Sequence, residues 1–144
     1  ISGESPGVDR AMELVKLAGG KAKKLNVSGA FHSPLMEFAV AGLSTALDLA
    51  HFANARFPIY ANVNAQPVSD AALARRLLLE QLTAPVHWTR TIESIALLHP
   101  GALFVEMGPG AVLKGLVKKI VPNATVLSCG TGADVDALLA VVNA

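Results

Sequence analysis

The stretch FVEMGPGAVLKGLVKKI, residues 104–120, passes from an apolar run through a glycine-rich turn into a helical pattern. Residues 102–106 predict a buried strand, Gly108-Pro109-Gly110 predicts a tight turn, and the helix that follows is expected to end near Ile120. The turn lacks the lysine and hydroxyl of a nucleotide loop, since Lys114 falls within the helix. We therefore interpret it as a structural strand-to-helix connection.

The same alternation of strands and helices continues on both sides of this stretch. Further strands are predicted at residues 23–28, 57–62 and 125–127, and further helices at about residues 6–18, 34–47, 70–82, 88–98 and 134–142. Pro6 and Pro34 follow Ser5 and Ser33, a pairing typical of helix starts. Strands that alternate with helices indicate an α/β fold with a largely parallel sheet.

Composition and charge exclude several classes of protein. The 144 residues are 52% hydrophobic and 16% charged, which is enough apolar material for a core and argues against disorder. A net charge of +1 gives no reason to expect a nucleic-acid partner. No apolar run reaches the roughly 18 residues of a membrane span, and Cys129 is the single cysteine, as in reducing compartments. We expect no membrane partner and a cytoplasmic location, with a plastid as the alternative.

His32 is the strongest candidate for chemistry. It follows the predicted strand 23–28 and directly precedes the predicted helix start at Ser33-Pro34. Ligands of open α/β sheets bind beyond the carboxyl ends of strands, and a helix N-terminus helps to keep an imidazole base neutral. The alternative is a loop histidine without a catalytic role. The other three histidines, His51, His87 and His99, lack metal-ligand spacing, so we expect no metal site.

A base of this kind needs a nucleophile. A serine in the α/β-hydrolase arrangement sits between two glycines at a sharp strand-to-helix elbow. Ser2, Ser28 and Ser128 each adjoin a glycine or a cysteine without having glycines at both required positions. The chain also opens at Ile1 without a methionine. We therefore expect the nucleophile to lie on an amino-terminal portion that precedes these residues.

Four segments resemble, in order, the malonyl-CoA:acyl-carrier-protein transacylase family of fatty acid synthesis. They are VSGAFHSPLM (27–36), IYANVNAQPV (59–68), QLTAPVHWTRTIE (81–93) and FVEMGPGAVLKGLVKKI (104–120). The resemblance implies a hydrolase-like α/β core with a mostly parallel sheet and a small inserted ferredoxin-like subdomain. Residues 1–28 would be the second half of that subdomain, and residues 29–144 the carboxyl-terminal part of the core.

The resemblance also implies roles for three residues. His32 matches the catalytic histidine, and Gln81 matches the glutamine whose backbone carbonyl orients that histidine. Phe31 matches the substrate-binding position whose phenyl group fills the space of an α-methyl group. The implied reaction moves a malonyl group from malonyl-CoA to the phosphopantetheine thiol of acyl carrier protein through a malonyl-serine, with no metal or redox cofactor.

The family's Gly-His-Ser-x-Gly elbow, carboxylate-binding arginine and oxyanion-hole glutamine would all lie upstream of Ile1. The expected partners are therefore the amino-terminal half with its serine, acyl carrier protein and malonyl-CoA, and the chain alone is expected to be inactive. Two other interpretations stay open. One is a patatin-like or lipase-like serine hydrolase, and the other is a non-catalytic fragment that complements another chain.

Overall fold

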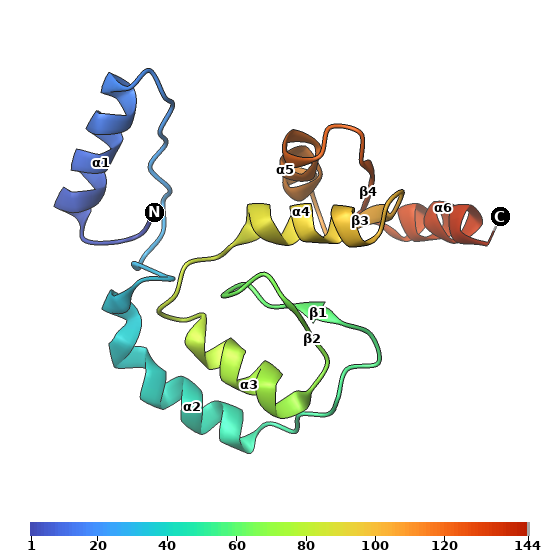
Figure 1. Ribbon diagram of the computed structural model, residues 1–144, viewed down its shortest axis with the longest axis horizontal. Coiled ribbons are helices and arrows are strands. Elements are labelled where there is room, and N and C mark those ends of the chain that lie inside the picture. The colour runs from blue at the N-terminus through green and yellow to red at the C-terminus, as the bar shows by residue number, and fades with distance from the viewer. Residues whose placement is uncertain (144) are drawn as a thin grey trace. The chain divides into compact units, whose positions relative to one another are not determined.

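The computed structural model describes residues 1–143 as two compact units, Ile1–His87 and Trp88–Ala144 (Figure 1). Both units contain helices and short strands, so the predicted α/β class is confirmed. The expected boundary after residue 28 falls inside the first unit, and the division into 1–28 and 29–144 stays a proposal.

The first unit begins with a helix and an extended segment. The helix α1 spans Ser5–Leu17, with Glu4 and not Ser5 at the N-cap position. Its apolar face and the segment 21–30 line an open groove of about 560 Å³. Residues 23–28, predicted as a strand, form none, because among residues 1–143 no other strand pairs with them. A strand is completed only by the hydrogen bonds of its neighbour.

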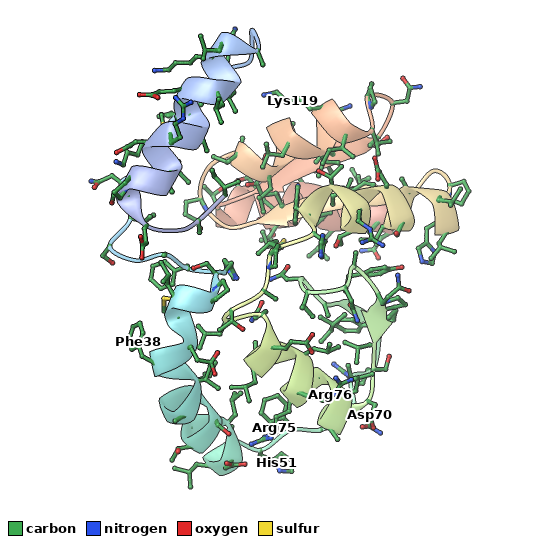
Figure 2. The ribbon with its side chains drawn as sticks, turned by 60° about the vertical axis from the view of Figure 1, so that its left-hand side comes forward. Phe38, His51, Asp70, Arg75, Arg76 and Lys119 are labelled. Atoms are coloured by element: carbon green, nitrogen blue, oxygen red, sulfur yellow. The ribbon has the colours of Figure 1, made fainter. Side chains whose placement is uncertain are left out.

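The rest of the first unit packs two helices beside a short hairpin. Its elements are the 3₁₀-helix η1 (Pro34–Ala39), α2 (Val40–Leu49), β1 (Ile59–Tyr60), β2 (Pro67–Val68) and α3 (Ala71–Glu80). Asp70, labelled in Figure 2 and predicted as the start of this helix, caps α3, since its Oδ1 accepts a hydrogen bond of 2.7 Å from the Leu73 amide. Arg75 joins α3 to α2 by donating to the Leu47 carbonyl and pairing with Asp48.

The hairpin is antiparallel and was predicted only in part. Tyr60 pairs with Pro67 and Ile59 with Val68, so β2 lies between the predicted strand 57–62 and the predicted helix 70–82, where no strand was predicted. The connecting turn places Ala65, which is 1% exposed, at a φ of 58°. This left-handed conformation is unusual for a residue with a Cβ.

The second unit contains the parallel pairing that the sequence predicted. Its elements are α4 (Trp88–Leu98), β3 (Leu103–Met107), α5 (Val112–Ile120), β4 (Thr125–Cys129) and α6 (Gly132–Val142). The strands β3 and β4 run parallel in the register Leu103↔Thr125 to Met107↔Cys129. Helix α5 connects them, packs on both and also contacts α4. The core comprises Ile92, Val117, Ala124 and Val126, surrounded by Trp88, Phe104, Ile120 and Val121.

The turn after β3 is stabilised by a carboxylate. Gly108 and Gly110 have φ values of 124° and 97°, which only glycine adopts without strain. The N-cap residue of α5, Ala111, has no capping side chain. Glu106 replaces it: its two carboxylate oxygens accept hydrogen bonds of 2.9 Å each from the amides of Leu113 and Lys114. The turn is thus structural, as predicted.

Helix α6 has a local cap. Thr131 and Asp134 form a capping box, in which each side chain accepts a hydrogen bond from the other residue's backbone amide. Hydrogen bonds from the Thr131 hydroxyl and from the amides of Gly130 and Thr131 hold the pKa of Asp134 below its usual value.

Candidate active site

His32 lies between the extended segment and η1 in a conformation that is rare for its residue type. Its φ is 60°, one of two positive values among the non-glycine residues 1–143. Such a conformation costs about 1–3 kcal/mol and occurs often at functional sites. The side chain is exposed. His32 does not precede the start of an α-helix, contrary to the prediction, because η1 is a 3₁₀-helix of six residues and α2 begins at Val40.

Ser33 shows why the expected cap does not form. It stands at the N-cap position of η1, yet its hydroxyl donates to the Ala30 carbonyl at 2.6 Å and caps no helix amide. This hydrogen bond closes the turn that carries Phe31 and His32. Ser33 itself is buried, at 5% exposed. The buried hydroxyl therefore fixes the loop.

The imidazole is oriented by a backbone carbonyl. Nδ1 of His32 lies 2.8 Å from the carbonyl oxygen of Gln81, although the two residues are 49 positions apart. A carbonyl only accepts, so Nδ1 is the donor, and in the neutral ring with this tautomer Nε2 carries the lone pair. The structure therefore brings together the two residues that were expected to cooperate and leaves Nε2 available as a base.

Gln81 can serve as acceptor because it ends a helix. It is the C-cap of α3, and its amide donates to the Leu77 carbonyl at 3.0 Å. The last carbonyls of a helix have no partner within the helix. His32 supplies that partner, so the hydrogen bond satisfies both groups.

Asn62 also belongs to this cluster and was missed by the sequence analysis. Its Nδ2 donates to Oε1 of Gln81 at 2.8 Å, and its carbonyl accepts from the amide of His87 at 2.9 Å. Asn62 lies within the quoted segment 59–68, but the pairing spans 19 residues and leaves no local signal.

Phe31 directly precedes the histidine. Its side chain is 44% exposed, and its ring lies against Gly29, where an added Cβ would stand 3.3 Å from Cε2. That distance is shorter than ordinary van der Waals contact. The absence of a side chain at residue 29 thus permits this position of the ring.

Three further residues considered from the sequence are His51, His99 and Cys129. His51 and His99 are exposed at helix ends, and Cys129 is buried on β4 in the second unit. Among residues 1–143 no group of three or more potential ligands could hold a metal ion. Within the same residues, no helix is both long and apolar enough to cross a bilayer.

One serine does have glycines at both required positions. Gly3-Glu4-Ser5-Pro6-Gly7 fits the Gly-x-Ser-x-Gly spacing, a match that the sequence analysis overlooked. Ser5 is the first residue of α1 and follows no strand within residues 1–4, and its φ is not positive. A nucleophile elbow needs a sharp, strained turn between a strand and a helix. The string therefore lacks the geometry of an elbow.

Comparison with known proteins identifies close relatives. No protein-family model matches the chain. The chain is 41% identical over 121 residues to the malonyl CoA-acyl carrier protein transacylase of Bacillus subtilis strain 168. This alignment covers 83% of this chain and 38% of the relative. It is 36% identical over 137 residues to the enzyme of the same name from Staphylococcus aureus strain COL, covering 94% of this chain and 44% of the relative.

Solved structures of malonyl-transacylases also match the chain. The chain matches a malonyl-transacylase in complex with its type II PKS acyl-carrier protein with a TM-score of 0.89 and 35% identity, over 96% of this chain and 45% of that one. The acyl-carrier-protein S-malonyltransferase of Bartonella henselae matches with a TM-score of 0.89 and 34% identity, over 99% and 45%. The chain thus spans less than half the length of these relatives.

Proposed function

We propose that this chain, which belongs to the malonyl CoA-acyl carrier protein transacylase family, supplies the histidine half of an active site that transfers malonyl groups. The donor would be malonyl-CoA and the acceptor the phosphopantetheine thiol of acyl carrier protein, in fatty acid synthesis. The partial coverage of the relatives fits a carboxyl-terminal portion, so the activity belongs to the complete protein.

One observation carries the proposal: the 2.8 Å hydrogen bond from Nδ1 of His32 to the carbonyl oxygen of Gln81. In a Ser-His-Asp triad a carboxylate fixes the tautomer and orientation of the histidine. Here a carbonyl performs that task without adding a negative charge. His32 is exposed in this chain, which leaves Nε2 accessible to a hydroxyl from another part of the protein.

The proposed reaction proceeds in two half-reactions. Nε2 of His32 takes the proton of the serine hydroxyl while the serine oxygen attacks the malonyl thioester carbon. The carbon–sulfur bond breaks, and Nε2 returns the proton to the coenzyme A thiolate. In the second half-reaction Nε2 takes the proton of the phosphopantetheine thiol, whose sulfur attacks the malonyl-serine ester. The serine oxygen leaves and recovers its proton.

Phe31 is proposed to select the acyl group. Its ring, placed one residue before the base, would occupy the space that the α-methyl of a methylmalonyl group needs. A steric fit of one methyl group discriminates by about 1–3 kcal/mol. Phe31→Ser should therefore raise the relative rate with methylmalonyl-CoA by about tenfold or more, and an unchanged ratio would refute this role.

Partners and location complete the proposal. A related malonyl-transacylase has been solved with its acyl-carrier protein, which supports the same class of partner for the protein that contains this chain. The two thioester substrates would supply all the reacting groups besides the serine and His32, so no resident cofactor or metal is needed. The relatives are bacterial, which favours a cytoplasmic location over a plastid.

The decisive test is His32→Ala in the complete protein, with malonyl transfer to acyl carrier protein as the measurement. Loss of a general base should lower the rate at least about a hundredfold. His51→Ala, a change of an exposed histidine on the same unit, is the matched control and should leave the rate unchanged. A near-normal rate for His32→Ala would rule the proposed mechanism out.

Two measurements separate the alternatives. A patatin-like or lipase-like hydrolase would pass its acyl group mainly to water, whereas a transacylase passes it to the carrier thiol. Native mass spectrometry of the chain would reveal an obligate partner if it is only a complementing fragment.

A further inference from the structure

Asn62 holds both ends of the loop that carries the orienting carbonyl. The loop 81–87 connects α3 to α4 and contains no helix or strand. At its first residue, Nδ2 of Asn62 donates to Oε1 of Gln81 at 2.8 Å. At its last residue, the amide of His87 donates to the Asn62 carbonyl at 2.9 Å. One residue of the β1–β2 turn thus fixes the loop at two points.

The contact to Gln81 constrains the carbonyl that His32 uses. The amide of Gln81 is fixed by its hydrogen bond to the Leu77 carbonyl, which is the last bond of α3. The peptide group that follows lies beyond the helix, where the backbone dihedral ψ of Gln81 decides the direction of the carbonyl. The Leu82 amide of that peptide group donates to the Leu79 carbonyl at 3.2 Å, while Asn62 holds the Gln81 side chain and His32 donates to the Gln81 carbonyl.

Gln81 borders a cavity, so its side chain needs the hydrogen bond from Asn62 to keep its position. Gln81 and Asn62 both line a cavity of about 290 Å³, whose other walls include Tyr60, Leu77 and Leu78. A glutamine side chain that lost its partner would have room to change its rotamer here. Packing alone therefore does not fix the side chain, and the hydrogen bond from Asn62 does.

We infer that Asn62 is a positioning residue: it fixes Gln81 so that the Gln81 carbonyl holds the imidazole of His32 in line with the reacting hydroxyl. The inference rests on the proposed function, because it assigns the orientation of the same base. Asn62 acts through Gln81 and does not touch the substrate in this role. Its loss should therefore lower the rate of the chemical steps and leave substrate binding unchanged.

The test uses the complete protein with four variants: Asn62→Ala, Gln81→Ala, the double variant and His32→Ala. Gln81→Ala removes the side-chain contact but keeps the backbone carbonyl. Each single change at residues 62 and 81 should lower kcat for malonyl transfer about tenfold, equivalent to about 1.4 kcal/mol, with KM for malonyl-CoA unchanged. The double variant should be no slower than either single one, because both remove one interaction.

Asn64→Ala is the matched control. Asn64 lies in the same turn, and its Oδ1 accepts from the Gln66 amide at 3.0 Å without reaching the loop 81–87. It should retain the normal kcat. If Asn62→Ala does not fold, Gln81→Ala and Asn62→Asp still decide the matter. Gln81 can turn its amide to donate to the aspartate, so Asn62→Asp should retain most of the rate.

The outcomes separate this inference from the proposed function. Loss of activity in His32→Ala with normal kcat in Asn62→Ala and Gln81→Ala would overturn the role of Asn62 alone. Full activity in His32→Ala would overturn the proposed function itself. Multiplicative losses in the double variant, or an increase in KM in place of a decrease in kcat, would also overturn the positioning role.

Discussion

Removing the carboxylate of Glu106 should loosen the start of α5. This carboxylate is the cap of the helix, since Ala111 provides none and both carboxylate oxygens accept from helix amides at 2.9 Å. Glu106→Ala removes both hydrogen bonds. Glu106→Gln keeps one oxygen as an acceptor and presents an amide donor to the second N–H.

The size of the effect follows from these contacts. A hydrogen bond to a charged group contributes about 1.5–3 kcal/mol, and loss of a helix cap typically costs about 0.5–2 kcal/mol. The bond from Leu113 is exposed and that from Lys114 partly buried, so solvent weakens both. We therefore expect a loss of about 2 kcal/mol for Glu106→Ala and about 1 kcal/mol for Glu106→Gln.

Amide hydrogen exchange measures this loss at the right place. A change of 2 kcal/mol corresponds to about a 30-fold increase in the opening equilibrium, so the amides of Leu113 and Lys114 should exchange about 30-fold faster in Glu106→Ala. Glu93→Ala, which changes an exposed glutamate on α4, is the control and should leave both rates unchanged. Unaltered protection of both amides in Glu106→Ala would refute the assignment of the carboxylate as the cap.

Three further predictions test other contacts. Because the folded pKa of Asp134 is lowered, its contribution to stability is present above its ordinary pKa of about 4 and is lost as pH falls below it. Asp134→Asn should flatten the pH dependence of the urea midpoint between about pH 5 and about pH 3, and an unchanged profile would contradict this. Ala65→Val should destabilise by about 3 kcal/mol in urea unfolding, since a β-branched residue at a φ of 58° has no room to relax; a cost below about 1 kcal/mol would be inconsistent. Arg75→Ala should cost only about 1 kcal/mol, because Asp48 is exposed, and a double-mutant cycle with Asp48→Asn should assign about half of that loss to the ion pair.

Elements with local signals were predicted well from the sequence. The α4 bounds of Trp88–Leu98 agree with the prediction, α5 ends at Ile120 as expected, and α3 begins at Ala71, one residue after the predicted start. Each of these signals lies within about one helical turn of the boundary it marks. Local backbone preference and side-chain capping were therefore sufficient.

Features that depend on distant contacts were predicted poorly. The expected strand at residues 23–28 has no partner among residues 1–143, and no local pattern reveals a missing neighbour. Strand β2 was missed because Pro67 lies in it and argues against a strand. The cap from Glu106 and the contact from Asn62 join different elements, so neither appears in a local window.

The prediction of the candidate site depended on the family resemblance. The residues alone made His32 a candidate, but nothing in the sequence pattern connects it with Gln81, 49 positions later. The resemblance supplied that pairing, and the 2.8 Å distance agrees with it. The catalytic roles of His32 and Gln81 and the substrate role of Phe31 stay predictions until the variants are measured.

The histidine and its acceptor lie within one compact unit, and this has a consequence for protein engineering. A chimera with its crossover between residues 87 and 88 would exchange everything from Trp88 onward and still inherit the intact pair from one parent. A crossover between residues 33 and 80 would draw the imidazole and its acceptor from different parents. Recombination libraries should therefore tolerate the first junction and lose base orientation at the second.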